Sequence, residues 1–470
     1  MARRDHLPRL TPPLPRVRTT GYLGAVRVHV TSLGCRLNEA EAAAWGRALA
    51  ARGHELVDGA RDADAAVINT CAVTHDAART SRRQLAALAD RVGCVVVTGC
   101  WATLEPARAA VGDHVIVVAN RDKEGVVDLL EARLGPAVAP ASAPAGPGLT
   151  GHTRAFVKVQ DGCRHRCTFC VTTVARGDER SRPAADVVSE IRTLVAAGFR
   201  EVVLTGVHLA GWGERGATLG DLLDAVLADT DLARLRLSSL EPWGLGPDLW
   251  RRWRDRRLLP HLHLPAQSGS DRVLRRMARR ARAGDVERLV AEARAAIAGL
   301  AVTTDLIAGF PGETDDDHAA TLALVARAGF AGAHVFPFSP RPGTRAAGLP
   351  DPVPPAVAAR RAAEIRTLAA AQRGDRMRAL VGAERRVLWE RPEPLAARRL
   401  RYHGYSDDYL PCTVDTDAGT SLWNRITHVR IDRVDGDRLV ATLAPSALAE
   451  PAMAAGGAAP PPRRRLPLAG

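Results

Sequence analysis

The chain of 470 residues contains no long apolar run, and this absence excludes a membrane-spanning protein. A helix that crosses a membrane needs about 18 or more consecutive apolar residues, and no stretch here reaches that length without charges. Residues 1–20 are rich in proline and arginine and have no apolar core of the kind found in secretory signals. We therefore expect a cytoplasmic protein with no membrane partner.

Lysine is scarce in this sequence, and arginine supplies almost all of the positive charge. The formal net charge is +13, from 65 basic and 52 acidic residues. Because the planar arginine side chain contacts phosphates and bases well, this excess favours a nucleic-acid partner. A sequence rich in alanine and arginine can also reflect genomic base composition, so the charge supports such a partner without deciding the matter.

Three of the eight cysteines lie close together at the spacing C-x3-C-x2-C: Cys163, Cys167 and Cys170. In a reducing compartment, clustered thiols are more often metal ligands than disulfides. A structural zinc ion takes four ligands, whereas a cubane iron–sulfur cluster held by three cysteines leaves one iron open for a substrate or cofactor. A zinc loop completed by a distant residue and a disulfide knot are the alternatives, but the spacing favours an iron–sulfur cluster.

Three further cysteines each follow a predicted strand in the first part of the chain. The strands 26–30, 65–68 and 94–98 lead to Cys35, Cys71 and Cys100, respectively, and helices are expected between them. Because the carboxyl ends of parallel strands meet at one edge of an open α/β sheet, these cysteines could bind a second cluster. The alternative for any single cysteine is a buried apolar role, which we expect for Cys94 and Cys412.

The remaining pattern predicts an α/β fold of three parts. Repeated strand–helix units between residues 155 and 338 indicate a partly closed parallel (β/α) barrel with its chemistry at the carboxyl ends of the strands. Short β-like runs between residues 385 and 443 indicate a small β-barrel. We expect these segments: a disordered leader 1–24, an open parallel α/β cluster domain 25–134, a linker 135–150, the barrel domain 151–380, the small β-barrel 381–445 and a disordered tail 446–470.

Three tyrosines fall within the predicted C-terminal barrel: Tyr402, Tyr405 and Tyr409. If they are exposed beside the arginines of this region, they suit stacking on the bases of a nucleic acid. The alternative is that they form the apolar core of the small barrel. The sequence leaves both interpretations open.

Several motifs together resemble the radical S-adenosylmethionine (SAM) methylthiotransferases over about residues 25–443. Besides the three-cysteine loop, they are Ser32–Asn38 (SLGCRLN), Asn69–Thr74 (NTCAVT), Leu204–Leu209 (LTGVHL), Leu237–Pro242 (LSSLEP) and His334–Thr344 (HVFPFSPRPGT). They are most similar to the type that converts N6-threonylcarbamoyladenosine at position 37 of tRNA to its 2-methylthio derivative. The resemblance implies an N-terminal cluster domain, a radical SAM barrel and a C-terminal RNA-binding module of the TRAM type.

The resemblance also implies cofactors and residue roles. Cys163, Cys167 and Cys170 would bind a [4Fe–4S] cluster whose open iron takes SAM, and Cys35, Cys71 and Cys100 would bind an auxiliary [4Fe–4S] cluster for sulfur insertion. One electron delivered to SAM would give a deoxyadenosyl radical, which the inert C2–H bond of adenine requires, and a second SAM would methylate the sulfur. The implied partners are the tRNA anticodon loop, an electron donor such as flavodoxin or ferredoxin, and a sulfur source.

Five residues in the barrel strands and loops are candidates for contacts with SAM or substrate: Gly206, Ser239, Glu241, Gln267 and Asp305. Gly206 would let a ligand approach the backbone, although it also suits a plain turn. Gln267 offers an amide, but the polar residues up to Ser270 would equally begin a helix. Ser239 and Glu241 could hold the ribose or methionyl end of SAM. Asp305 is an ionisable group in an apolar strand, which is costly unless it is paired or functional.

One segment departs from the family pattern. After Cys170 the family carries an apolar residue and a proline, where this chain has Thr172 and Thr173. The departure concerns the substrate-facing side of the loop and leaves the cluster cysteines intact. Alternative substrates are isopentenyladenosine at position 37 of tRNA and an aspartate of a ribosomal protein. From another class, the chain could be a non-catalytic iron–sulfur RNA-binding protein, which would not explain a three-ligand cluster beside polar barrel loops.

Overall fold

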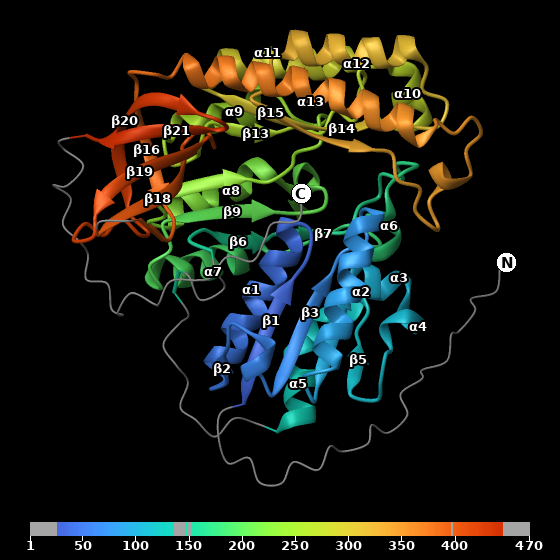
Figure 1. The fold of residues 1–470 in the computed structure, drawn as a ribbon, viewed down its shortest axis with the longest axis vertical. Helices are drawn as coiled ribbons and strands as arrows, with labels where there is room; N and C mark the ends of the chain where they lie inside the picture. Colours follow the sequence, from blue (N-terminus) through green and yellow to red (C-terminus); the bar gives the residue numbers. More distant parts are fainter. Residues whose placement is uncertain (1–25, 136–145, 148–151, 396–397, 445–470) are drawn as a thin grey trace.

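A computed structural model describes residues 26–135, 146–147, 152–395 and 398–444 (Figure 1). The predicted leader, most of the predicted linker and the predicted tail lie outside the described residues. An α/β sheet, an open parallel barrel and a small β-barrel follow one another along the chain, which confirms the predicted fold class. Within the described part, no helix is long and apolar enough to cross a membrane.

The N-terminal unit is a five-stranded parallel sheet in the order β2-β1-β3-β4-β5. Its strands are β1 (Arg27–Ser32), β2 (Glu55–Leu56), β3 (Ala65–Thr70), β4 (Val95–Gly99) and β5 (Val115–Val117), and its helices are α1 (Arg36–Ala51), α2 (His75–Ala89), α3 (Cys100–Leu104), α4 (Pro106–Ala109) and α5 (Val126–Leu134). Strands β3 and β4 are buried along their whole length, which explains their nearly continuous apolar sequence. The sequence predicts the three central strands but not the edge strands β2 and β5, which have only two and three residues.

The central unit is an open barrel of parallel strands: β6 (Ala155–Lys158), β9 (Glu201–Thr205), β12 (Arg234–Leu237), β13 (His261–His263), β14 (Ala301–Ala308) and β15 (Gly332–Pro337). They form two sheets, β6-β9-β12 and β13-β14-β15, and single bridges from Leu235 to Leu258 and from Ser239 to His263 join them. Among the described residues, β6 and β15 are not paired with each other. The barrel is therefore open between these two strands.

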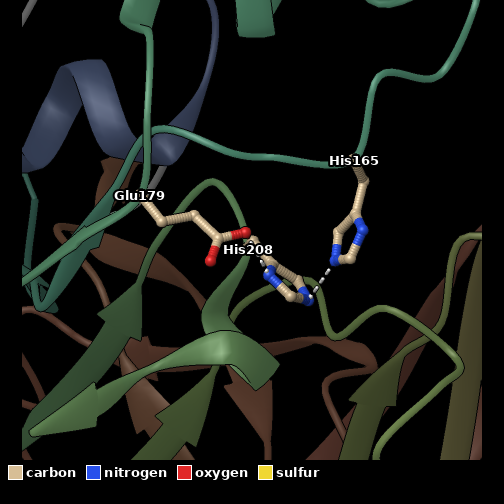
Figure 2. Close-up of side chains that lie close together, drawn as sticks. All are labelled: His165, Glu179 and His208. Atoms are coloured by element: carbon tan, nitrogen blue, oxygen red, sulfur yellow. Dashed lines mark hydrogen bonds and ion pairs between the residues drawn. The ribbon is translucent and has the colours of Figure 1, made fainter.

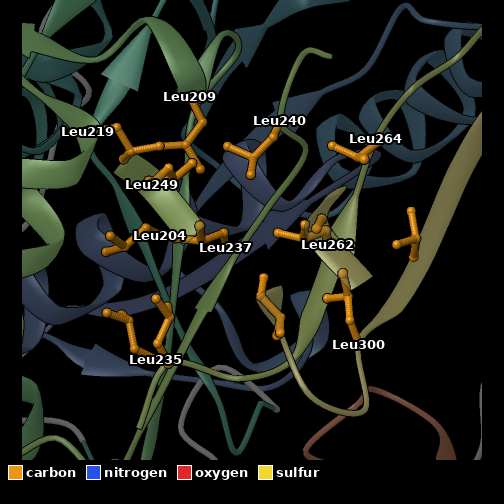
Figure 3. Close-up of a cluster of buried hydrophobic side chains, with 14 of the residues drawn as sticks. Leu204, Leu209, Leu219, Leu235, Leu237, Leu240, Leu249, Leu262, Leu264 and Leu300 are labelled. Carbon is orange, nitrogen blue, oxygen red and sulfur yellow. The ribbon is translucent and has the colours of Figure 1, made fainter. Parts of the chain in front are cut away.

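Helices cover the outside of the barrel (Figure 1): α7 (Ala184–Ala196), α8 (Leu219–Asp229), α9 (Pro247–Trp250), α10 (Asp271–Arg276), α11 (Ala283–Ala296), α12 (Asp315–Ala328) and α13 (Pro355–Arg378). A leucine-rich core fills the space beneath them, with Leu204, Leu237 and Leu262 on neighbouring strands (Figure 3). Along β14, alternate residues are packed in this core, so the partly exposed Thr303, Asp305 and Ile307 face the inside of the barrel. The carboxyl-end loops carry helix α6 (Val171–Arg176) and the short strand pairs β7 (Gln160–Asp161) with β8 (Arg180–Ser181) and β10 (Gly213–Glu214) with β11 (Ala217–Thr218).

The C-terminal unit is a closed antiparallel β-barrel with one parallel contact. Its strands are β16 (Glu384–Trp389), β17 (Glu393–Pro394), β18 (Arg399–Ser406), β19 (Pro411–Asp417), β20 (Ile426–Asp435) and β21 (Arg438–Leu443). They run in the order β16-β20-β21-β19-β18, and β18 pairs back onto β16, so only the short β17 lies outside the ring. Cys412 lies in the core of this barrel, and Cys94 lies in the core beside β4, which confirms the buried role predicted for both.

The three tyrosines of this barrel do not form an exposed stacking surface. Tyr402 is only 2% exposed and belongs to the barrel core, so the nucleic-acid interpretation is wrong for this residue. The Tyr405 and Tyr409 rings stack on each other with centroids 4.9 Å apart, and Arg154 lies over the Tyr405 ring at 4.6 Å. The faces predicted to stack on bases are thus occupied by neighbouring side chains.

The loop between β18 and β19 is docked against buried charges at the start of the barrel strands. Glu201 contacts Arg234 at 2.7 Å and Arg236 at 2.9 Å, and all three side chains are fully buried. Both arginines also donate to the carbonyl oxygen of Ser406, at 3.2 and 3.3 Å. Burial raises the pKa of Glu201, but the two arginines outweigh it and bring the pKa down to about 2. The C-terminal barrel is therefore fixed to the amino end of the open barrel.

Another buried charge network joins the N-terminal unit to the open barrel. Glu41 of α1, which packs on β6, contacts Lys123 at 2.6 Å, Lys158 at 3.3 Å and Arg176 at 3.0 Å. These two lysines are the only ones in the chain. Arg176 ends the helix that follows Cys170 and also contacts Asp161 at 2.9 Å. Because the three cations outweigh the effect of burial, the pKa of Glu41 is held far below its usual range.

Replacing Glu41 by glutamine should lower the free energy of unfolding by about 3–5 kcal/mol, because three cations would stay buried without their shared anion. Urea unfolding followed by tryptophan fluorescence measures the loss. The exposed Glu55 of the same unit supplies the control, since Glu55→Gln should change stability by less than about 0.5 kcal/mol. Equal stability of the Glu41 variant and the wild-type protein would show that the network does not hold the two units together.

Candidate functional site

The structure brings Cys35, Cys71 and Cys100 together at one edge of the N-terminal sheet. Cys35 is the N-cap of α1 just after β1, Cys71 directly follows β3, and Cys100 begins α3 directly after β4. Strands β1, β3 and β4 are neighbours in the sheet. Gly34 has a φ of +95°, and a Cβ atom there would lie 2.5 Å from the Cys71 sulfur. The glycine before Cys35 is therefore needed for the close approach of the Cys35 and Cys71 loops.

The second group of cysteines lies on a loop at the carboxyl end of β6. The Cys163 amide donates to the carbonyl oxygen of Gly177 at 3.0 Å, which closes one end of the loop. In the middle of the loop, the Thr168 amide donates to the Met277 carbonyl oxygen at 3.0 Å. The Thr168 hydroxyl donates to the Arg276 carbonyl oxygen at 2.9 Å. The loop that carries Cys163, Cys167 and Cys170 is thereby tied to the end of α10.

Among the described residues, neither cysteine group is packed as tightly as a single zinc ion would require. Two sulfurs on one zinc ion lie about 3.8 Å apart, as follows from Zn–S bonds of about 2.3 Å. Within the described residues, neither group has all of its sulfurs within 4.8 Å of one another. Burial raises the pKa of Cys71 and of Cys163 to about 12, so these thiols become thiolates only where a cationic centre compensates the charge.

Each sulfur of the barrel loop accepts a hydrogen bond from the protein. The His165 amide donates to Cys163 at 3.4 Å, Arg279 Nη1 donates to Cys167 at 3.9 Å, and the Thr173 hydroxyl donates to Cys170 at 3.7 Å. A proline at position 173 could not make the last of these bonds. The departure from the family pattern therefore adds a hydrogen-bond donor to the Cys170 sulfur.

Arg279 connects Cys167 with the loop after β12. Its side chain is only 2% exposed, and its Nη2 atom lies 2.7 Å from Glu241 and donates to the carbonyl oxygen of Pro265 at 2.7 Å. The guanidinium also lies 4.5 Å from the ring centre of Trp243. Burial lowers the pKa of Arg279, but Glu241 and Cys167 raise it by more, so the net shift is upward. A permanent positive charge therefore stands beside the loop that carries Cys163, Cys167 and Cys170.

A polar chain that the sequence did not reveal runs from the same loop into the barrel (Figure 2). His165 Nε2 lies 3.3 Å from His208 Nε2, and His208 Nδ1 lies 3.0 Å from a carboxylate oxygen of Glu179. Trp243 donates to His165 at 3.3 Å, and the Arg164 amide donates to Glu179 at 3.1 Å. Because Trp243 and His208 both contact His165 Nε2, we interpret the group as an anchor for the cluster loop.

Two of the predicted SAM contacts have structural reasons of their own. A Cβ atom at Gly206 would lie 2.9 Å from the Gln160 side chain, whose amide oxygen accepts from the His208 amide, so the protein itself requires a glycine there. Gln267 has a φ of +69° and pairs with β14 through the carbonyl oxygen of Asp305, at 2.8 Å. Ser270 caps α10, which confirms the helix-start alternative for this segment.

The other predicted residues lie at the carboxyl end or on the inner face of the barrel. Ser239 bridges to His263, and Glu241 holds Arg279 as described above. Asp305 lies 3.2 Å from His263, whose ring centre is 5.9 Å from that of His334. Burial raises the pKa of Asp305, but the hydrogen bond and charge of His263 outweigh it, so the net shift is downward. The costly aspartate in an apolar strand is therefore paired.

Known families match both α/β units. A model described as "Radical SAM superfamily" matches residues 157–325, and one described as "Uncharacterized protein family UPF0004" matches residues 27–119. The Threonylcarbamoyladenosine tRNA methylthiotransferase MtaB of Thermotoga maritima is 33% identical over 377 residues, which cover 77% of this chain and 86% of the relative. The tRNA-2-methylthio-N(6)-dimethylallyladenosine synthase of Paracoccus denitrificans is 35% identical over 396 residues, covering 78% and 86%.

The chain belongs to the radical SAM methylthiotransferase family. This confirms the resemblance seen in the motifs. The radical S-adenosylmethionine methyltransferase TsrM of Kitasatospora setae, solved with its tryptophan substrate and a SAM analogue, superposes with a TM-score of 0.51 at 16% identity, over 69% of this chain and 75% of that chain. At such low identity the likeness concerns the fold alone.

Some polar contacts of this methylthiotransferase were within reach of sequence reasoning, and others were not. Glu241 was named as a candidate from its family motif, whereas His208 stood in another family motif and was not singled out. Arg279 and Trp243 gave no signal, because Arg279 stands in an arginine-rich stretch and each contact spans more than 30 residues.

In this methylthiotransferase, Thr173→Val should lower the reduction potential of the barrel cluster, because the hydroxyl donor to Cys170 stabilises the more negative reduced state. A tenfold change in the reduction equilibrium is about 59 mV for one electron. A hydrogen bond of about 1 kcal/mol changes the equilibrium by somewhat less than tenfold, so the expected shift is somewhat smaller than this value. Redox titration followed by electron paramagnetic resonance measures the shift. Thr172→Val is the matched control, and Thr173→Ser should restore the wild-type value. Identical potentials in the Thr173 and Thr172 valine variants would contradict the role of the hydroxyl.

Proposed function

We propose that this methylthiotransferase adds a methylthio group to C2 of the adenosine at position 37 of tRNA that carries an N6-threonylcarbamoyl group. The proposal rests on one observation, namely that the buried Glu41–Arg176 contact joins the helix that begins after Cys35 to the helix that begins after Cys170, so the two cysteine groups are held near each other. Asn120 supports the same arrangement, since its amide lies 3.8 Å from the Cys100 sulfur and donates to the Ala175 carbonyl oxygen at 2.9 Å.

As a radical SAM protein, the chain uses SAM and [4Fe–4S] clusters. In our proposal, Cys163, Cys167 and Cys170 hold the cluster that binds SAM, and Cys35, Cys71 and Cys100 hold the auxiliary cluster. When bound, these groups supply the one-electron chemistry that an inert C–H bond requires. The chain's own part is to bind them, to donate hydrogen bonds to their sulfurs and to keep the two sites at a fixed separation through Arg176. A flavodoxin or ferredoxin as electron donor, a sulfur source and the C-terminal barrel as an RNA-binding module complete the proposal.

Arg36 favours the threonylcarbamoyl substrate over an isopentenyl one. The threonylcarbamoyl group ends in a carboxylate, whereas the isopentenyl group is apolar. Arg36 follows Cys35 directly and donates to the Tyr409 hydroxyl at 2.9 Å. Burial raises the pKa of Asp305, and the charge of Arg36 helps to lower it, after the larger effects of His263 and His334. At His334, burial lowers the pKa, Asp305 raises it, and His263 and then Arg36 lower it further. A guanidinium at the inner face of the open barrel suits a substrate carboxylate.

Two cysteine variants test the division of labour. Cys167→Ala should abolish formation of 5′-deoxyadenosine and all modification, whereas Cys71→Ala should still form 5′-deoxyadenosine and make no methylthio product. The assay needs purified protein, a low-potential reductant, SAM, and tRNA from a deletion strain that carries threonylcarbamoyladenosine, with both products measured by mass spectrometry. Methylthio product at the wild-type yield from the Cys71 variant would rule out the N-terminal cysteines as the sulfur-inserting site.

Arg36→Met tests the substrate choice. Loss of a charge-assisted bond of about 1.5–3 kcal/mol should raise the KM for tRNA bearing threonylcarbamoyladenosine by about tenfold or more. Arg52→Met, at the far end of the same helix, is the control, and iron content shows that both variants keep their clusters. An unchanged KM in the loaded Arg36 variant, or efficient wild-type activity on isopentenyladenosine, would assign the enzyme to a different nucleoside.

A further inference from the structure

Phe336 is an exposed aromatic residue on the inner face of the open barrel. It lies near the carboxyl end of β15 and is 43% exposed. Val335 belongs to the leucine-rich core beneath the helices, so Phe336 points the opposite way, toward the inside of the barrel. A single exposed apolar side chain is ordinary on a protein surface. The residues around this ring are what give it a meaning.

Polar side chains lie beside Phe336 on the same face. Strands β14 and β15 are parallel, with Asp305 opposite the exposed His334 and Ile307 opposite Phe336. The ring centre of His334 is 5.9 Å from that of His263. From the spacing of strands and of residues along them, Asp305 and Phe336 lie roughly 8 Å apart. This separation suits a purine that lies on the Phe336 ring with its polar edge toward Asp305.

Asp305 is held as a hydrogen-bond acceptor with one oxygen to spare. Its Oδ2 atom lies 3.2 Å from His263 Nε2, and His263 Nδ1 lies 2.9 Å from the Thr303 hydroxyl. Because a carboxylate only accepts, His263 Nε2 carries the proton of its contact with Asp305. In the described part of the chain, no group donates to Asp305 Oδ1, and 29% of this side chain is exposed. The free oxygen can therefore accept from an N–H group of a ligand.

This face lies between the barrel cysteine loop and the open side of the barrel. Ile307 packs against the same apolar cluster as Phe169, which stands between Cys167 and Cys170. On the other side, β15 has no strand partner besides β14 among the described residues. A base that is still attached to its RNA can enter only from an open side, whereas a free nucleoside can also be enclosed. The open edge beside Phe336 therefore favours a base of an RNA over the adenine of SAM.

We propose that Phe336 is the platform on which the target adenine of the RNA stacks, and that Asp305 accepts a hydrogen bond from its exocyclic N–H. The inference rests on the proposed function and names residues that hold the base at position 37. Stacking on an aromatic ring accepts any base, and a hydrogen bond at the base edge adds the preference for adenine. No covalent bond forms or breaks in this role. The two contacts fix the plane and the rotation of the base, and so decide which of its C–H bonds faces the cysteine loop.

The test measures binding of the full chain, loaded with its clusters and without SAM, to fluorescein-labelled hairpins of the anticodon arm. Three hairpins differ only at position 37, which carries adenosine, purine riboside without the amino group, or no base. Fluorescence anisotropy gives the Kd of each complex. Phe336→Ala should weaken binding of the adenosine hairpin by about tenfold, and Phe336→Tyr should restore it. Val111→Ala, at another exposed apolar residue, is the control.

The hairpins separate the two contacts. The loss in Phe336→Ala should persist with purine riboside, which still stacks, and vanish with the abasic hairpin. Asp305→Asn should weaken binding of the adenosine hairpin by about fivefold, because a charged acceptor becomes a neutral one, and should match the wild-type protein on purine riboside. Iron content and far-UV circular dichroism show that the variants are loaded and folded.

Two results would overturn the proposal. One is wild-type affinity of Phe336→Ala for all three hairpins. The other is a loss of SAM affinity in Phe336→Ala, measured by equilibrium dialysis, with unchanged affinity for RNA, because the ring would then hold the adenine of SAM. Since the hairpins carry no threonylcarbamoyl group, the proposed function fails separately. A wild-type protein that shows the predicted base dependence but modifies only isopentenyladenosine would keep the base site and refute the choice of substrate.

Discussion

The contact between Glu41 and Arg176 is the constraint on which the functional arrangement depends. Removing both charges from water is costly, and the cost is offset only because each keeps several partners. Arg176 contacts Glu41, Asp161 and Asn38. Glu41 also forms ion pairs with both lysines of the chain. Since Glu41 lies on the helix that begins after Cys35 and Arg176 ends the helix that begins after Cys170, this one network relates the two cysteine groups.

Buried arginines also act on the thiols of the two cysteine groups. Desolvation raises the pKa of Cys35 and Cys167 as well as that of Cys71 and Cys163, so the site as a whole disfavours isolated thiolates. The charge of Arg176 acts against this effect at Cys35, and that of Arg279 does so at Cys167. Buried guanidiniums keep their charge at any physiological pH. A buried arginine thus stands beside each of the two cysteine groups and partly offsets the effect of burial on the thiols.

The sequence predicted most of this fold because its signals are local. The C-x3-C-x2-C spacing, the three strands that end near cysteines and the alternating strand–helix units each occupy a short window. The contact of Glu41 with Arg176 gave no signal, because the two residues are 135 positions apart and meet only when separate units dock. Tyr402 was ambiguous for a related reason, since an aromatic residue in a short strand faces either the core or the surface, and only the closure of the barrel decides which. The edge strands β2 and β5 were missed because two or three residues show no periodicity.

The C-terminal barrel is docked onto the open barrel and is not freely tethered to it. Its loop between β18 and β19 supplies carbonyl oxygens to Arg234 and Arg236, and Tyr409 from the same loop reaches Arg36 beside Cys35. Removing the barrel would expose Glu201 and both arginines at the amino end of the strands, so a truncated chain would lose stability together with any RNA contact. A tRNA held by this barrel would therefore be held at a fixed position relative to Asp305 on the inner face of the open barrel and to Arg36 at the start of α1. Recognition of the tRNA body and placement of its modified base are then mechanically coupled, and substitutions at exposed residues, rather than truncation, separate one from the other.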